Sequence, residues 1–154
     1  MKKILFINAS PRRNGNTARM AAEVIGNHDY QTLTLADYRI NSYGSNLDGD
    51  ELDQIVKAMK QADVLVIGSP VYWHNLAGIL RVVMDRFYGW IDDGTFQGRD
   101  LFVIYQGAAP TDWMLHDGEY SLQRFATMYG FNWKGVATSD EEAGRLHTVF
   151  EEIL

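Results

Sequence analysis

Short apolar runs recur along this chain, and segments with helical periodicity separate them. Three of the runs are continuous: Ile4–Ile7, Val64–Ile67 and Leu101–Tyr105. Continuous apolar runs of this length are typical of strands buried on both faces of a parallel sheet. Two further segments, Gln31–Leu35 and Phe131–Lys134, alternate between apolar and polar residues. Alternation suits a strand with one wetter face, so we expect these two strands at the sheet edges.

The segments between the runs carry apolar residues at the spacing of one helix face. The clearest stripe lies before the fourth strand and consists of Leu76, Ile79, Leu80, Val83, Met84 and Phe87. Shorter stripes fall within residues 20–25, 52–59 and 122–126. Ser139 and Glu142 form a capping box that predicts the start of the last helix, and Gly130 is expected just beyond the end of the fourth.

Strands and helices therefore alternate over the whole chain, without a linker or repeat. We predict a single domain over residues 1–154, with an α/β fold built on a doubly wound, five-stranded parallel sheet. Right-handed crossovers and edge positions for the second and fifth strands favour the strand order 2-1-3-4-5. Ligands of such sheets bind beyond the carboxyl ends of the strands, where the order reverses. The loops after the first and third strands are therefore the first places to search for a site.

Composition excludes several kinds of chemistry. The chain has no cysteine, which rules out disulfides, thiolate nucleophiles and iron–sulfur ligands from its own residues. The four histidines are scattered without metal-ligand spacing, so we expect no metal site. The net charge of −6 argues against a nucleic-acid partner. No apolar stretch is long enough for a signal peptide or a membrane span, so we expect a cytoplasmic protein with no membrane association.

The loop after the first strand has the composition of an anion site. It reads SPRRNGNT over residues 10–17, within a segment 1–20 that holds five cations and no acid. Ser10, Asn16 and Thr17 offer neutral donors, Gly15 allows close approach of the backbone, and Arg12 carries a permanent charge. The amides at the start of the following helix have no intrahelical partners and favour an anion. The alternative is a tight turn with an N-cap, although such a turn needs no arginine.

Known phosphate motifs narrow the choice of ligand. The loop contains neither the G-x-x-x-x-G-K-[ST] pattern of a P-loop nor the G-x-G-x-x-G pattern of a dinucleotide site. Phosphoryl transfer from ATP and a tight NAD site in this loop are therefore disfavoured. A single terminal monophosphate, as in FMN, fits the loop better.

The third strand is followed by a predicted loop, Gly68–Asn75, that contains Tyr72 and Trp73. Large aromatic side chains at the mouth of a crevice suit a flat aromatic ligand, because stacking adds to burial. The same residues also suit a cover for the sheet edge or a contact between subunits, and composition does not choose between these interpretations.

The two loops together, SPRRNGNT and PVYW followed by the helix that ends Met84-Asp85-Arg86, resemble the NADPH-dependent FMN reductase group. The sequence is most similar to the flavin domain of the iron–sulfur flavoprotein branch, and Phe96–Arg99 also fits that pattern. The resemblance implies a flavodoxin-like fold with FMN as cofactor and NAD(P)H as electron donor. One departure is clear. That branch carries a cysteine cluster after the second strand, whereas the corresponding stretch here, Asn41–Asn46, has none.

The resemblance also implies which residues bind the cofactor. The FMN phosphate is expected at Ser10, Arg12, Asn16, Thr17 and the Ala18 amide. The ribityl chain and the isoalloxazine are expected along Pro70, Val71, Tyr72 and Trp73. Gln106 and Gly107 are expected near the polar edge of the flavin, although the glycine-rich pattern of the family is only partly kept there.

We therefore expect an FMN-dependent NAD(P)H oxidoreductase that reduces free flavin, a quinone or another small acceptor. No catalytic side chain is predicted, because the cofactor carries the redox chemistry. The alternatives are a flavodoxin-like electron carrier without its own turnover and an interaction module that has lost its flavin. Aromatics expected around the crevice mouth, together with the family's usual flavin site at a subunit boundary, predict a homodimer, or a dimer of dimers. These aromatics are Tyr72, Trp73, Tyr88, Trp90 and Trp113, all expected around the crevice mouth.

Overall fold

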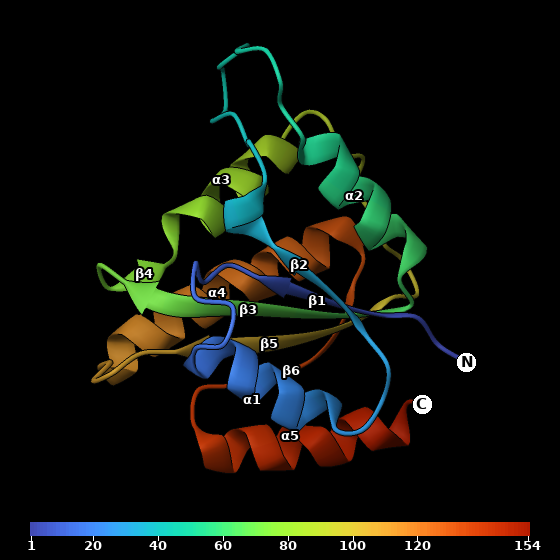
Figure 1. The fold of residues 1–154 in the computed structure, drawn as a ribbon, viewed down its shortest axis with the longest axis vertical. Helices are drawn as coiled ribbons and strands as arrows, with labels where there is room; N and C mark the ends of the chain where they lie inside the picture. The colour runs from blue at the N-terminus through green and yellow to red at the C-terminus, as the bar shows by residue number, and fades with distance from the viewer.

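A computed structural model describes all of residues 1–154, which form an α/β fold (Figure 1). Its strands are β1 (Ile4–Asn8), β2 (Gln31–Thr34), β3 (Val64–Tyr72), β4 (Asn75–Leu76), β5 (Asp100–Gln106) and β6 (Asn132–Ala137). Its α-helices are α1 (Asn16–Ile25), α2 (Leu52–Gln61), α3 (Gly78–Phe87), α4 (Asp112–Tyr129) and α5 (Asp140–Glu152). A short 3₁₀ turn, η1 (Leu35–Asp37), follows β2. None of the helices is both long and apolar enough to cross a membrane.

The sheet order is β2-β1-β3-β5-β6, and all pairs along this path are parallel. The predicted five-stranded order is therefore confirmed, with β5 and β6 as the fourth and fifth parallel strands. One element was not predicted. The short strand β4 pairs antiparallel with the far end of β3, outside the parallel path.

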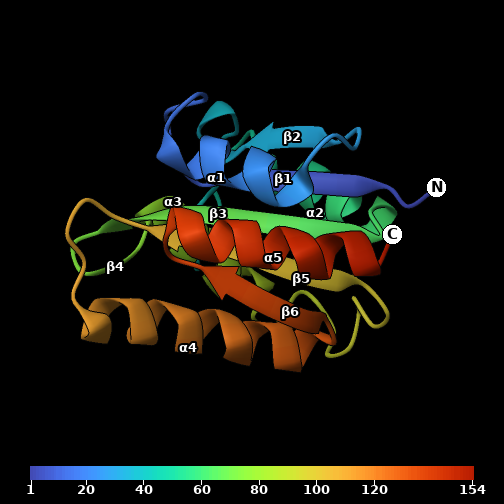
Figure 2. The ribbon, with the colours of Figure 1, turned by 90° about the horizontal axis from the view of Figure 1, so that it is seen from below.

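The continuous apolar runs arise because the central strands are covered on both faces. Along β1, Leu5 and Ile7 face one core, whereas Ile4 and Phe6 face the other. The first core is closed by α2, α3 and α4, and the second by α1 and α5. Figures 1 and 2 show these two layers on opposite sides of the sheet. Every residue of β1 therefore has an apolar environment, whichever way its side chain points.

Local signals at the helix ends are also confirmed. Gly130 ends α4 in the left-handed conformation, with φ of 84°. Ser139 caps α5 by accepting a hydrogen bond from the Glu142 amide at 3.3 Å. The reciprocal bond of the capping box differs from expectation, because the Glu142 carboxylate accepts from the Thr138 amide at 2.7 Å.

Candidate functional site

The carboxyl ends of β1, β3 and β5 meet at one crevice. Its first part is a cavity of about 290 Å³ lined by Ser10, Arg12, Gly15, Asn16, Thr17, Pro70, Val71, Tyr72, Gln106, Gly107 and Ala108. An adjoining cavity of about 320 Å³ shares Val71, Gly107 and Ala108 with the first and adds Trp73, His74, Ala109, Pro110 and Met114. We call the two cavities together the crevice. The structure thus brings together every predicted binding residue except Ala18, which lies in the first turn of α1 behind the lining.

The loop over residues 10–15 is held in shape by Asn8, a residue that sequence reasoning missed. Asn8 is fully buried at the end of β1. Its Oδ1 accepts a hydrogen bond from the Ser10 amide at 3.0 Å, and its Nδ2 donates to the Arg12 carbonyl at 3.4 Å. The same carbonyl accepts from the Gly15 amide at 3.4 Å. A polar residue that ends an apolar run is the only signal for this role in the sequence.

The start of α1 presents free hydrogen-bond donors to the crevice. The helix begins after Gly15, which supplies no capping side chain, and its first turn contains no acid. The amides of Asn16, Thr17 and Ala18 make no hydrogen bond within the protein. The Ser10 hydroxyl accepts from the Arg12 amide at 3.2 Å, which leaves its own hydrogen free to donate. Such an array, together with the helix dipole, fits a bound anion.

Only one of the arginines in this region is left free to bind such an anion. Arg13 pairs with Asp37 at 2.5 Å, and Arg19 pairs with Asp140 at 2.8 Å. Arg12 lines the crevice and has no acidic group within 4.0 Å. The loop therefore offers one unpaired guanidinium, that of Arg12, the arginine predicted to bind the anion.

Thr17 connects the first loop to the end of β5. It is buried, and its Oγ1 accepts a hydrogen bond from Gln106 Nε2 at 3.0 Å. A Cβ placed on Gly68 would lie 2.6 Å from Thr17 Cγ2, so the start of α1 packs directly on the backbone of β3. A glycine is therefore required at position 68. Through these contacts, Thr17 joins the start of α1 to the ends of β3 and β5 on the other side of the crevice.

The predicted loop Gly68–Asn75 is wrong in its conformation. β3 continues through Tyr72 and turns back into β4, so that Val71 pairs with Leu76 and Tyr72 with Asn75. The strand includes Pro70, although proline has no amide hydrogen for a ladder. The ladder between β1 and β3 ends at Gly68, so β1 does not pair with β3 from Ser69 onward. On its other side β3 stays paired with β5 as far as Pro70. Pro70 therefore need not donate an amide hydrogen to β1.

The turn of this hairpin is unusual. Its two residues, Trp73 and His74, both have positive φ, at 45° and 68°. Two-residue turns of this kind favour Asn-Gly, because other side chains are strained there. Trp73 is 96% exposed and Tyr72 is 45% exposed, so both aromatic rings stand at the rim of the crevice. Asn75 donates to Asp117 of α4, which attaches the hairpin to the neighbouring helix.

The third side of the crevice begins where β5 ends. A Cβ on Gly107 would lie 3.0 Å from Val71 Cβ, so a glycine at this position lets the ends of β3 and β5 approach closely.

Tyr105, two residues before Gly107, points into the core, and its hydroxyl donates to the Met114 carbonyl at 3.2 Å. Burial, aided by Asp117, raises the pKa of Tyr105 to about 12. Tyr105 therefore supports the wall and is no proton donor to a ligand near neutral pH.

Comparisons with known proteins agree with this geometry. The family model for NADPH-dependent FMN reductase matches residues 2–118, which include all three walls of the crevice. An iron–sulfur flavoprotein of Methanocaldococcus jannaschii is 37% identical over 98 positions, covering 54% of this chain and 51% of that protein. An iron–sulfur flavoprotein of Archaeoglobus fulgidus is 31% identical, covering 54% and 48%. The chain thus spans about half the length of these relatives.

Solved structures support the fold at lower identity. The Trp repressor binding protein of Bacillus subtilis superposes with a TM-score of 0.73 at 20% identity, covering 99% of each chain. An FMN-dependent NADH-azoreductase of Bacillus anthracis, solved in complex with FMN, gives a TM-score of 0.71 at 17% identity, covering 99% of this chain and 97% of that one. The match of the family model over most of the chain, on the residues that form the crevice, shows that this protein belongs to the NADPH-dependent FMN reductase family.

Proposed function

We propose that the protein is a flavoenzyme that binds FMN without a covalent bond and transfers electrons from NAD(P)H to a small acceptor. The acceptor is free flavin, a quinone or a similar small molecule. The single observation that carries the proposal is the set of unpaired hydrogen-bond donors at the start of α1. These donors lie at one end of the crevice, and the crevice continues from there to the β3–β4 hairpin. We further propose that the enzyme acts in the cytoplasm as a homodimer.

The donor set fits the phosphate of FMN. The amides of Asn16, Thr17 and Ala18 and the Ser10 hydroxyl can each donate one hydrogen bond to a phosphate oxygen. Arg12 supplies the positive charge that remains unpaired within the protein. No acidic side chain lines either part of the crevice, so nothing there repels a dianion.

The rest of the crevice fits the ribityl chain and the flavin ring. Pro70 and Val71 form one wall and Gln106 and Gly107 the other, and the close approach at Gly107 makes the space between them narrow. The exposed rings of Tyr72 and Trp73 extend the wall toward solvent, where an aromatic ligand can lie against them.

When bound, FMN supplies the hydride and electron transfer, as flavins do in other enzymes. The chain's own residues then bind and orient it. We assign no side chain the role of general acid or base, because the cofactor carries the redox chemistry. Tyr72 and Trp73 stand at the rim and frame the opening, which leaves room for a nicotinamide or acceptor ring to approach the flavin.

The main alternative is an electron carrier without its own turnover. The net charge of −6 is compatible with this alternative, because an acidic carrier can dock on a basic partner. Protein loaded with FMN and mixed anaerobically with NADPH, and separately with NADH, distinguishes the two. An enzyme loses the yellow flavin absorbance within minutes with at least one donor. If dithionite bleaches the protein and neither nucleotide does, the carrier replaces the reductase. If the protein binds no FMN at all, both proposals fail and an interaction module remains.

A further inference from the structure

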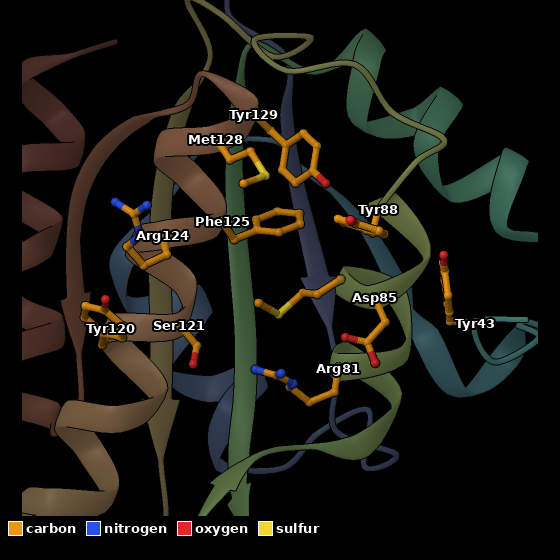
Figure 3. A pocket seen from close by; sticks show the side chains of 11 residues that line it. Tyr43, Arg81, Asp85, Tyr88, Tyr120, Ser121, Arg124, Phe125, Met128 and Tyr129 are labelled. Carbon is orange, nitrogen blue, oxygen red and sulfur yellow. The ribbon is translucent and has the colours of Figure 1, made fainter.

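Only some of the exposed aromatic residues lie at the crevice. Tyr88 lines a separate groove of about 490 Å³ between α3 and α4 (Figure 3), and Trp90 lines a hollow that borders this groove. The expectation that both residues surround the crevice mouth is therefore wrong, because α3 leads the chain away from the carboxyl ends of the strands. The rim is formed by Tyr72 and Trp73 of the β3–β4 hairpin, so the position of this hairpin decides the shape of the opening.

The base of the hairpin is anchored in the core. Leu76 belongs to the larger apolar cluster, and Ser69 is fully buried. The Ser69 hydroxyl accepts a hydrogen bond from the Ala77 amide at 2.9 Å and donates to the Pro70 carbonyl at 2.9 Å. These contacts fix where the hairpin begins and ends, but they do not reach the residues of its turn.

The turn has a conformation that its own side chains do not favour. Trp73 and His74 have φ of 45° and 68°, and both side chains are exposed, so no core packing holds them there. A strained backbone of this kind persists only where surrounding contacts hold it in place. The turn therefore needs a contact close to its tip.

One hydrogen bond supplies this contact. Asn75, directly after the turn, donates from its Nδ2 to Oδ2 of Asp117 on α4, which packs beside β4 (Figures 1 and 2). The Oδ1 of Asn75 accepts from the Leu76 amide at 2.8 Å. Because a carboxylate only accepts and a backbone amide only donates, one orientation of the Asn75 side chain satisfies both. No other side-chain hydrogen bond connects residues 72–75 with another element.

Asp117 has no other partner in the structure. It is half-buried, yet no cation lies within 4.0 Å of its carboxylate. A carboxylate that is partly removed from water depends on the hydrogen bonds that it accepts, and Asn75 donates the one bond found here. Burial raises the pKa of Tyr105 in β5, and the charge of Asp117 adds to that rise. Asp117 thus lies where the hairpin, α4 and β5 meet.

The turn and the start of α4 line the same part of the crevice. We call this part, of about 320 Å³, the second cavity. Trp73 and His74 border it from the hairpin, and Met114 borders it from α4. Its other lining residues are apolar or glycine, and its volume is at the lower end for small-molecule sites. The second cavity therefore suits a small, planar and uncharged ring, such as that of a quinone, which can stack on Trp73.

We propose that Asp117 is a positioning residue that holds the strained hairpin through Asn75, so that Trp73 and His74 border the second cavity and bind the planar ring of the acceptor there. Asp117 itself lines neither part of the crevice, so it acts only through the hairpin. The inference rests on the proposed function and deepens it, because it assigns the acceptor ring to one cavity and names the residue that shapes this cavity.

The first test measures hydrogen exchange of the hairpin amides in the apoprotein. Asp117→Ala should make the amides of residues 71–77 exchange about tenfold faster, the lower end of the effect of a hydrogen bond to a charged group, because this pair is only half-buried. Asp117→Asn should exchange much like the unaltered protein, since its side-chain oxygen still accepts from Asn75.

Glu119→Ala is the matched control. Glu119 is a half-buried carboxylate on the same helix, and it accepts a hydrogen bond from the side-chain amide of Gln123 at 3.1 Å. Its replacement removes a comparable bond that does not reach the hairpin. The hairpin amides should therefore exchange as slowly as in the unaltered protein.

The second test exchanges donor and acceptor. Asn75→Asp sets two carboxylates against one another and should speed hairpin exchange at least as much as Asp117→Ala. The double variant Asn75→Asp, Asp117→Asn should restore slow exchange. In that variant the carboxylate at position 75 accepts from both the Leu76 amide and the new side-chain amide at position 117. Thermal unfolding confirms that each variant is folded.

The third test connects the hairpin with the site. Protein loaded with FMN is assayed with NAD(P)H and the quinone menadione, and each NAD(P)H supplies two electrons that, with protons, convert one menadione to its hydroquinone. Without the Asn75–Asp117 bond the strain favours a relaxed turn. If the relaxed turn predominates about two to one, the competent fraction falls to about a third and the KM for menadione rises about threefold. Asp117→Ala and Asn75→Asp should show this rise with little change in kcat, and the double variant should reverse it.

Three results would overturn this inference. The first is hairpin exchange in Asp117→Ala that is no faster than in Glu119→Ala. The second is faster exchange with an unchanged KM for menadione, which would leave Asp117 a purely structural residue. The third is a reduced flavin that menadione does not reoxidise.

Failure of the proposed function gives a different pattern. Protein that binds no FMN, or whose flavin neither nucleotide reduces, refutes the proposed function, and exchange in the apoprotein still decides whether Asp117 holds the hairpin. The ratio of FMN to riboflavin affinity should be the same in every variant, because the phosphate donors lie at the start of α1 and in the loop before it.

Discussion

Replacement of Arg12 by alanine tests the anion site most directly. A charge-assisted hydrogen bond contributes about 1.5–3 kcal/mol, which corresponds to about a 10- to 150-fold change in Kd. Arg12 is exposed to solvent, and water screens its charge. We therefore expect FMN to bind about 10- to 30-fold more weakly to Arg12→Ala, at the lower end of that range. Riboflavin, which has no phosphate, should lose little affinity.

The adjacent residue gives the control. Arg13→Ala removes a guanidinium one position away that is already paired with Asp37. It should leave FMN binding unchanged and cost at most about 1 kcal/mol of stability, the usual upper value for an exposed ion pair. Both affinities are measured by titrating apoprotein and following the quenching of flavin fluorescence, at low and at high salt. Equal losses for FMN and riboflavin, or equal effects at positions 12 and 13, would refute the phosphate site.

Three further predictions concern stability. Gly118→Ala would set a methyl group 2.2 Å from the Tyr105 ring, so we expect a loss of about 1–3 kcal/mol in a denaturant titration; an unchanged midpoint would show that the ring moves freely. The hydrogen bond from Arg86 lowers the pKa of Asp50 below its ordinary 3.8 in the folded protein, so this pair stabilises the fold above about pH 4 and the effect is lost as pH falls. Asp50→Asn should therefore lower Tm at pH 7 and by progressively less as the pH falls below about 4; a difference that does not change with pH would contradict the pair. Replacing Trp73-His74 by Asn-Gly should raise Tm by several degrees, because Asn-Gly adopts this turn without strain; a lower Tm would show that these side chains stabilise the hairpin.

Much of the site could be predicted because its chemistry is local. The free donors of residues 10–17 follow from a helix that starts after a glycine, and that start is visible in the sequence. Other features depend on residues far apart in the chain. Arg13 is neutralised by Asp37, 24 residues away, and Thr17 bonds to Gln106 across 89 positions. Asn8 shapes the first loop from its buried position at the end of β1, and its place after an apolar run does not by itself reveal those hydrogen bonds.

The sequence by itself determined the order of the parallel strands and the helices, the parallel sheet and the two segments that meet at its switch point. Each of these follows from periodicity or from bonds between near neighbours, which single segments encode. The tertiary structure decided the β3–β4 hairpin and which loop arginine stays unpaired. β3 extends past Pro70 where β1 stops opposite Gly68, and Arg13 is paired because Asp37 lies beside it in the fold. Such outcomes depend on where neighbouring elements end, and no local pattern records that.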